Sequence, residues 1–155
     1  MNKHEFFMNI ALFEANSAGK LDEVPVGACI VNSFGEVIAA AGNRSIELND
    51  PTAHAEVLAI RRACEKVDNY RLTEMTLYTT IEPCVMCAGA LVNARIATLV
   101  FGADDKRFGA VRSKFSLCDT GSLNHQMEII PNVLAAECGQ LMTDFFGKKR
   151  GNKYE

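Results

Sequence analysis

Short apolar, β-branched runs alternate with longer helix-like segments along this chain of 155 residues, and the alternation limits the folds open to it. A helix with one apolar face must bury that face against another element, and a sheet offers a surface to several helices at once. The sequence therefore predicts an α/β protein in three layers, with a mixed sheet between two layers of helices. Because the length is that of one ordinary domain, we expect residues 1–155 to form a single domain.

The expected elements begin with a helix that Asn2 caps and that continues to about Ala18, with Phe6, Ile10 and Phe13 facing inward and Ala11 as a further candidate for that face. The elements expected after it are strands at 26–31 and 36–41, a helix at 52–67, a strand at 76–80, a helix at 84–94, a strand at 98–101, a strand at 127–130 and a helix at 132–146. A long loop, 102–124, precedes the last strand, and connections of that length are usually functional.

The composition excludes several classes of protein. With 48% hydrophobic and 23% charged residues, the chain is neither disordered nor collagen-like. The most apolar early stretch, residues 6–13, is interrupted by Asn9 and followed by Glu14, so it fits neither a membrane span nor a signal peptide. We therefore expect a cytoplasmic protein without membrane association.

Six cysteines are many for a cytoplasmic chain of this length, so their roles have to be considered. Because the cytoplasm keeps thiols reduced, metal binding, catalysis or burial explains them better than disulfides do. One pair has the C-x-x-C spacing, and the other four stand singly in apolar surroundings, where small core residues are expected. The pair is Cys84 and Cys87, and the single cysteines are Cys29, Cys64, Cys118 and Cys138.

Potential zinc ligands stand at the expected starts of two helices. Zinc prefers imidazole nitrogen and thiolate sulfur, and a catalytic zinc site has three protein ligands with water at the fourth position. His54, Cys84 and Cys87 supply that number of ligands. Pro83 fixes where its helix begins, and the free N–H groups of a helix start favour the thiolate form of a cysteine. These residues predict a zinc site.

Glu56 follows His54 by two residues, so the two side chains would point away from each other on a regular helix. At the first turn of a helix, however, both can face one site end-on. The Glu56 carboxylate would then lie near the metal without binding it, where it can take a proton from zinc-activated water and give it to a substrate.

Two other interpretations of these motifs remain open. The C-x-x-C pair could be redox-active, as in thioredoxin-like proteins. Alternatively, a fourth ligand from another cysteine or from His125 would close a structural zinc site, as expected of a non-catalytic binding module. Neither interpretation explains Glu56, and the combination of His-x-Glu with a later Pro-Cys-x-x-Cys is the signature of zinc-dependent nucleobase deaminases. A catalytic zinc site is therefore favoured.

At these motifs the chain resembles the cytidine-deaminase-like superfamily and, within it, the bacterial tRNA-specific adenosine deaminase family. The resemblance implies a five-stranded mixed sheet and a homodimer with one Zn²⁺ per subunit. It also implies hydrolysis of adenosine to inosine at the wobble position of a tRNA anticodon stem-loop, most commonly in an arginine tRNA. The segments that carry the resemblance are 23–28, 42–44, 50–56, 69–72, 82–90, 100–103 together with Asp105, 124–125 and 144–146.

The resemblance assigns roles to further residues. Asn43 and the backbone of Ala55 would hold the flipped nucleotide, and Val24 and Ile81 would form walls of its pocket. Without the resemblance, Asn43 could instead shape a turn, and Val24 and Ile81 could be ordinary core residues. The residues expected to contact neighbouring anticodon-loop nucleotides are Asp105, Lys106, Arg107, Asn124, Phe145 and Arg150.

The long loop departs from the family pattern. Arg112 stands where a glycine is common, so the path of the loop differs or its backbone torsions must suit a larger residue. Phe108 adds a bulky apolar group to the same loop, and Arg107 replaces the usual lysine. Neither the zinc ligands nor Glu56 is affected.

Charge is distributed unevenly, although the net charge is only −3. Residues 1–105 carry 8 basic and 14 acidic side chains, whereas residues 106–155 carry 8 and 5. Two basic clusters could hold the phosphates of a short nucleic-acid segment, or could simply be solvated.

The alternative substrate is a free nucleobase or nucleoside, such as guanine or cytosine, which would not require the two basic clusters. The clusters are Lys106, Arg107, Arg112 and Lys114 in the loop, and Lys148, Lys149, Arg150 and Lys153 in the tail.

Overall fold

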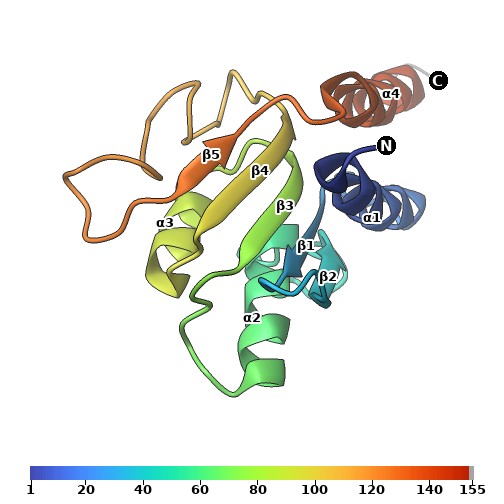
Figure 1. Cartoon of the computed structure of the whole chain (residues 1–155). Helices are drawn as coiled ribbons and strands as arrows, with labels where there is room; N and C mark the ends of the chain where they lie inside the picture. Colours follow the sequence, from blue (N-terminus) through green and yellow to red (C-terminus); the bar gives the residue numbers. More distant parts are fainter. Residues whose placement is uncertain (154–155) are drawn as a thin grey trace.

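The computed structural model describes the backbone of residues 1–153 and contains a five-stranded sheet between two layers of helices (Figure 1). The expected three-layer α/β fold is thereby confirmed. In chain order the elements are α1 (Lys3–Lys20), β1 (Gly27–Val31), β2 (Val37–Gly42), α2 (Ala55–Val67), β3 (Thr76–Ile81), α3 (Val85–Ala94), β4 (Thr98–Ala103), β5 (Glu128–Ile130) and α4 (Ala135–Lys153). The side chains of Asn152 and Lys153, and residues 154–155 of the expected domain, lie outside the described part.

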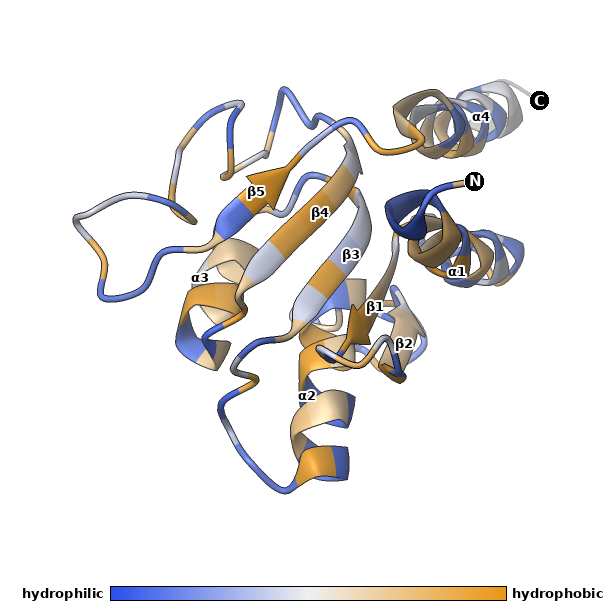
Figure 2. Cartoon of the chain, viewed as in Figure 1, coloured by the Kyte–Doolittle hydropathy of each residue, from blue (hydrophilic) through white to orange (hydrophobic). Residues whose placement is uncertain are grey.

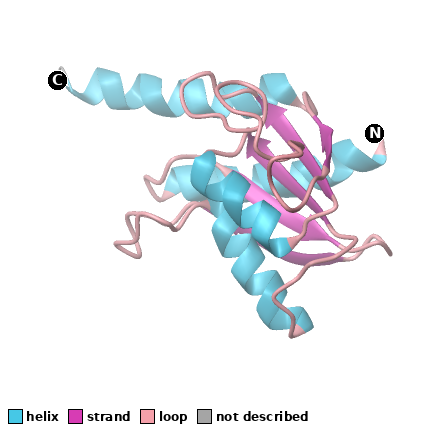
Figure 3. Cartoon of the chain, turned by 90° about the vertical axis from the view of Figure 1, so that its left-hand side faces the viewer, coloured by secondary structure: helices cyan, strands magenta, loops and turns pink. Residues whose placement is uncertain are grey.

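The strand order in the sheet is β2-β1-β3-β4-β5. β1 pairs antiparallel with both β2 and β3, whereas β3, β4 and β5 run parallel to one another. Helices α1 and α4 lie side by side on one face of the sheet, and α2 and α3 cover the other (Figures 1 and 3). The carboxyl ends of β3 and β4 consequently reach the same edge of the sheet at which β1 begins.

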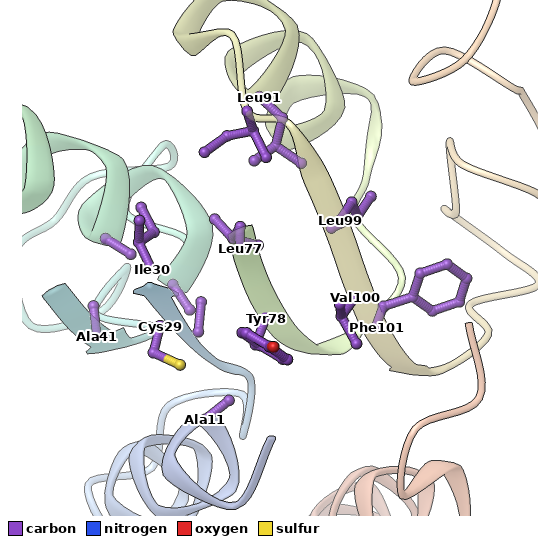
Figure 4. Close-up of a cluster of buried hydrophobic side chains, with 14 of the residues drawn as sticks. Ala11, Cys29, Ile30, Ala41, Leu77, Tyr78, Leu91, Leu99, Val100 and Phe101 are labelled. Carbon is purple, nitrogen blue, oxygen red and sulfur yellow. The ribbon is translucent and has the colours of Figure 1, made fainter. Parts of the chain in front are cut away.

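Buried side chains of the central strands form the core. The hydropathy colouring shows apolar residues along β4 and at the end of β5, while most of the connecting loops are polar (Figure 2). Burial of each large apolar side chain contributes roughly 1.5–3 kcal/mol to the stability of the fold. The strands therefore hold the residues at their ends in fixed positions. The close-up labels Ala11, Cys29, Ile30, Ala41, Leu77, Tyr78, Leu91, Leu99, Val100 and Phe101, all of them at most 1% exposed (Figure 4).

Helix α1 begins at the expected cap, since the Asn2 side chain accepts a hydrogen bond from the backbone N–H of Glu5. The prediction of its inward face, however, was wrong for Phe6 and Phe13, which are 55% and 69% exposed. Ile10 is half-buried and packs against the core. The side chains that α1 buries are those of Phe7, Met8, Ala11, Leu12, Ala15 and Ala18.

Two glycines explain which face of α1 is buried. Gly27 and Gly42 are paired neighbours on β1 and β2, directly beneath this helix. A Cβ atom at Gly42 would lie 2.7 Å from the carbonyl oxygen of Glu14, and one at Gly27 would collide with the carbonyl oxygen of Ala11. The backbone of α1 therefore approaches the sheet too closely for large side chains at the contact, and the alanine-rich face turns inward.

The starts of three helices differ from the expected positions, and two of the differences concern the zinc motif. α2 begins at Ala55, later than residue 52, and His54 is its N-cap with extended backbone torsions. α3 begins at Val85, with Cys84 as its N-cap in the same conformation. α4 begins at residue 135 and continues past 146 to 153. None of the helices within residues 1–153 is long and apolar enough to cross a membrane.

Candidate active site

The three predicted zinc ligands lie together at the edge of the sheet where α2 and α3 begin. The Nδ1 atom of His54 is 3.6 Å from the Sγ atom of Cys84 and 3.5 Å from the Sγ atom of Cys87. With zinc–nitrogen and zinc–sulfur bonds of about 2.05 and 2.3 Å, tetrahedral ligands would be separated by about 3.6 Å. The observed separations therefore fit a tetrahedral zinc ion.

No fourth protein ligand joins this group among the residues that the structure describes. Cys29, Cys118 and Cys138 are fully buried elsewhere, and Cys64 is half-buried. The Nε2 atom of His125 lies 2.7 Å from the carbonyl oxygen of Ile96. A zinc ion held by these three residues would keep one position open, as in catalytic sites, whereas a structural site would need a fourth ligand that the described residues do not supply.

Glu56 lies in the first turn of α2 and is 3% exposed. Its burial raises the pKa of the carboxyl group to about 7. The pKa of the Cys84 thiol is instead lowered to about 4, because Cys87 donates a hydrogen bond to it and His54 lies beside it. The thiolate, the form in which cysteine binds metals, is thus favoured at Cys84, whereas the same hydrogen bond raises the pKa of the Cys87 thiol. The carboxyl group beside them has a pKa suited to proton exchange near neutral pH.

A cavity of about 790 Å³ opens directly over this group. Its volume lies within the range of small-molecule binding sites. The buried or half-buried side chains that line it include six residues that the sequence predicted for zinc, catalysis or substrate: Val24, Asn43, His54, Glu56, Ile81 and Cys84.

Asn43 connects the end of β2 to the start of α2. Its side-chain oxygen accepts a hydrogen bond of 2.7 Å from the backbone N–H of Ala55, and its own backbone N–H donates to Val26. Because the oxygen is engaged, the amide NH₂ group of Asn43 is the part left to a ligand in the cavity. Ala55 is fully buried and does not line the cavity, so its N–H group acts on the site through Asn43.

The rim of the cavity is formed by the long loop on one side and by α4 on the other. Asp105 and Arg107, both predicted RNA contacts, line the loop side, and the predicted contact Arg150 lines the α4 side. Lys106 and Asn124 do not line the cavity. Three of the six predicted contacts are thus brought to the site.

Phe145 does not face the site either. It lines a second hollow between α1 and α4, where the Lys149 ammonium lies 5.4 Å from the centre of its ring. The adjacent Phe146 lines the cavity instead. Successive side chains on a helix point about 100° apart. Which of two neighbouring phenylalanines faces the cavity therefore depends on the rotation of the helix about its axis.

Glu82 is the functional residue that sequence reasoning missed. It follows β3, is 2% exposed and anchors the long loop, which has no helix or strand from 104 to 127. Its Oε2 atom accepts backbone N–H groups at 2.8–3.1 Å, and its Oε1 atom accepts one more N–H and a hydroxyl at 3.0 and 2.5 Å. The N–H donors are Val111, Arg112, Ser113 and Asp105, and the hydroxyl belongs to Ser113.

Glu82 also fixes the backbone of the loop at Arg112. The backbone N–H of Arg112 donates to Glu82 at 2.8 Å, and its φ angle is not among the positive values in the chain. The Arg112 guanidinium lies 3.0 Å from the carboxylate of Asp119, so an ion pair closes the loop further on. An arginine is therefore accommodated at this position without strain.

The sequence profile of the MafB19-like deaminases matches residues 1–150. The chain belongs to this deaminase family. A tRNA-specific adenosine deaminase of Haemophilus influenzae is 46% identical over 149 residues, which cover 96% of this deaminase and 86% of the relative. The enzyme of the same name from Aquifex aeolicus is 46% identical over 150 residues, covering 96% and 97% of the two chains.

Solved structures agree with this assignment. One structure, from a study of A-to-I editing by tRNA:A34 deaminases at the wobble position of transfer RNA, has a TM-score of 0.85 and 46% identity to this deaminase. The match covers 88% of this chain and 98% of the other. A guanine deaminase from Nitrosomonas europaea has a TM-score of 0.80 at 25% identity, covering 91% and 83%. Fold similarity thus extends to both substrate classes. A guanine deaminase from Bacillus subtilis is 43% identical with a TM-score of 0.64, but it covers only 67% of this chain, whereas the tRNA deaminases above match 96% of it at 46% identity.

Proposed function

We propose that this deaminase hydrolyses adenosine to inosine at the wobble position of a tRNA, using one zinc ion, and that an arginine tRNA is its substrate. The observation that carries the proposal is the composition of one continuous cavity. Its buried part is lined by His54, Cys84 and Glu56, and its exposed part adds Arg107, Phe108, Phe146 and Arg150. A small neutral base would use only the buried part, whereas an RNA loop would also use the arginines and aromatic rings.

His54, Cys84 and Cys87 would hold the zinc ion, as their separations and the lowered pKa of Cys84 favour. A zinc ion bound there would lower the pKa of a water molecule and so supply the nucleophile. The walls formed by Val24 and Ile81 would exclude bulk water from the purine ring, and the NH₂ group of Asn43 would hold the nucleotide from the side.

Glu56 carries the protons in this mechanism. Its carboxylate accepts a proton from the attacking water and delivers it to N1 of the purine, while the water oxygen forms a bond to C6. It then transfers the proton of the new C6 hydroxyl group to the exocyclic nitrogen. The C6–N bond breaks, and inosine and ammonia leave. One carboxylate therefore serves both steps, which explains why it is buried beside the ligands but is not one of them.

The proposal includes the setting of the enzyme. The family resemblance supports a homodimer with one zinc ion per subunit, a single deaminase domain over residues 1–155, and a cytoplasmic location, where tRNA is available. An adenosine in an anticodon loop is unpaired, so its extrusion into the cavity costs less than extrusion from a duplex.

An anticodon stem-loop with adenosine at the wobble position tests the substrate directly. We expect the protein to convert that adenosine to inosine, as measured by nucleoside mass spectrometry, and to leave free adenosine, cytosine and guanine unchanged under the same conditions. A matched stem-loop with its only loop adenosine outside the anticodon is the control and is expected to remain unmodified. Deamination of the free compounds alone would replace this proposal with a nucleobase or nucleoside deaminase.

A further inference from the structure

Phe108 is an exposed aromatic side chain at the rim of the cavity. It is 60% exposed, lines the cavity together with Arg107, and stands on the loop that follows β4. The guanidinium carbon of Arg107 lies 5.2 Å from the centre of the Phe108 ring, over one of its faces. The arginine thus covers one side of the ring and leaves the rest of it open to solvent.

The turn that carries Phe108 is held in place by hydrogen bonds. The side-chain Oδ1 atom of Asp105 accepts the backbone N–H groups of Arg107 and Phe108, both at 3.1 Å. The backbone N–H of Gly109 donates to the carbonyl oxygen of Asp105 at 2.8 Å, and the N–H of Asp105 donates to the buried Glu82 at 3.0 Å. The ring is therefore presented by a fixed backbone, because the turn is tied to the same carboxylate that organises the loop.

Gly109 adds a second constraint on this turn. A Cβ atom at that position would lie 2.5 Å from the carbonyl oxygen of Asp105 and would collide with the carboxylate of Glu82. The backbone directly after Phe108 is thus pressed against the anchor and cannot carry a larger residue. A preorganised backbone reduces the entropy lost when a ligand binds to the side chain that it presents.

The opposite side of the rim repeats the same combination of side chains. Phe146, which is 40% exposed, and Arg150 line the cavity from α4. Nucleobases stack on aromatic rings, and arginines bind the phosphates between them. The entrance to the cavity therefore offers an aromatic ring and a guanidinium on each side, in a cavity whose buried part takes one base.

We propose that Phe108, backed by Arg107, is the stacking platform for a nucleobase next to the reacting adenosine. This inference rests on the proposed function and adds a second nucleotide subsite to it. The ligand is an unpaired base of single-stranded RNA, with its adjoining phosphate near Arg107. Stacking places the neighbouring base outside the cavity and thereby holds the reacting base inside it, so Phe108 acts as a specificity-determining residue.

The variant Phe108→Ala tests the platform, and Phe115→Ala is its matched control. Phe115 lies in the same loop, is 55% exposed and does not line the cavity. We expect Phe108→Ala to lower kcat/KM for the wobble-adenosine stem-loop about tenfold, through KM, since that is the usual effect of one lost base stack. Phe115→Ala and the conservative variant Phe108→Tyr are expected to stay within about twofold of the unaltered protein.

The decisive experiment uses stem-loops in which one nucleotide next to the reacting adenosine lacks its base. Removing the stacked base should weaken binding of the unaltered protein, measured by fluorescence anisotropy, by the same factor as Phe108→Ala. The variant itself should no longer distinguish the abasic from the complete stem-loop. Equal sensitivity of both proteins to the abasic sites, or unchanged binding by Phe108→Ala, would overturn the platform.

Because anisotropy does not depend on turnover, the two proposals fail separately. If the unaltered protein deaminates the stem-loop and Phe108→Ala is indistinguishable from it in both measurements, the platform is wrong and the proposed function stands. If no stem-loop is deaminated but binding still depends on Phe108 and on the neighbouring base, the platform stands and the proposed reaction is wrong.

Discussion

Replacing Glu56 with glutamine is expected to reduce the deamination rate about 100- to 10,000-fold, which is the range for loss of a general acid–base group. Glutamine has nearly the same shape but cannot accept the proton of the attacking water. The side chain is buried beside the zinc ligands without being one of them, so zinc content and melting temperature should change little. Single-turnover kinetics on the stem-loop, together with metal analysis, would measure both quantities.

A glutamate outside the cavity provides the control for this variant. Glu47 lies on the loop that follows β2, is paired with Arg44 at 2.7 Å and does not line the cavity. We expect Glu47→Gln to keep the full deamination rate. If Glu56→Gln were as active as Glu47→Gln, the assignment of Glu56 as the proton carrier would be wrong. If Glu56→Gln lost its zinc, Glu56 would have to be reinterpreted as a ligand.

The second large effect is expected from Cys84→Ala. Removing one of three protein ligands leaves too few to retain the ion, and activation of water by a metal contributes several kcal/mol to catalysis, so activity should fall about 1,000-fold or more. The melting temperature should fall as well, because a bound zinc ion connects the first turns of α2 and α3. Added zinc should restore the activity of the chelator-treated unaltered protein but not that of the variant.

Cys64→Ala is the matched control for the ligand variant. Cys64 is half-buried, as Cys84 is, but it belongs to the far part of α2 and to no group of metal ligands among the described residues. This variant should keep one zinc ion per chain and normal activity. Equal zinc content in Cys84→Ala and Cys64→Ala would show that the ion, if bound at all, lies elsewhere.

The order of the elements and the zinc motif could be predicted from the sequence because both depend on local patterns. Strands and helices alternate with clear apolar runs, and the C-x-x-C spacing places two sulfur atoms on one turn. The end-on arrangement of His54 and Glu56 could also be anticipated, since only the start of a helix brings both to one site. The structure realises it with His54 as the N-cap and Glu56 in the first turn.

The inward face of α1 could not be predicted, because the helix carries two apolar stripes. One contains Phe6 and Phe13, and the other is rich in alanine. Apolar size favoured the phenylalanines, but the paired glycines Gly27 and Gly42 require a close approach of backbones, which favours the alanines. That requirement arises from tertiary contacts between segments far apart in the sequence.

The residues at the rim of the cavity could not be predicted either, because their positions also depend on tertiary structure. Whether Phe145 or Phe146 faces the cavity depends on the phase of a helix whose start at Ala135 differs from the expected one. The role of Glu82 depends on five hydrogen bonds from a loop without periodic pattern. A glutamate between a buried strand and the Pro-Cys motif was the available signal, because an acidic residue in such a place must find partners.

In the proposed mechanism, three side chains hold a catalytic zinc ion and leave its fourth position to water. X-ray absorption at the zinc edge of the protein in solution, combined with metal analysis, tests it most directly. We predict one zinc ion per chain, with two sulfur neighbours at about 2.3 Å and two nitrogen or oxygen neighbours at about 2.0–2.1 Å. A third sulfur neighbour, or a protein that binds no zinc when the metal is supplied, would contradict the account.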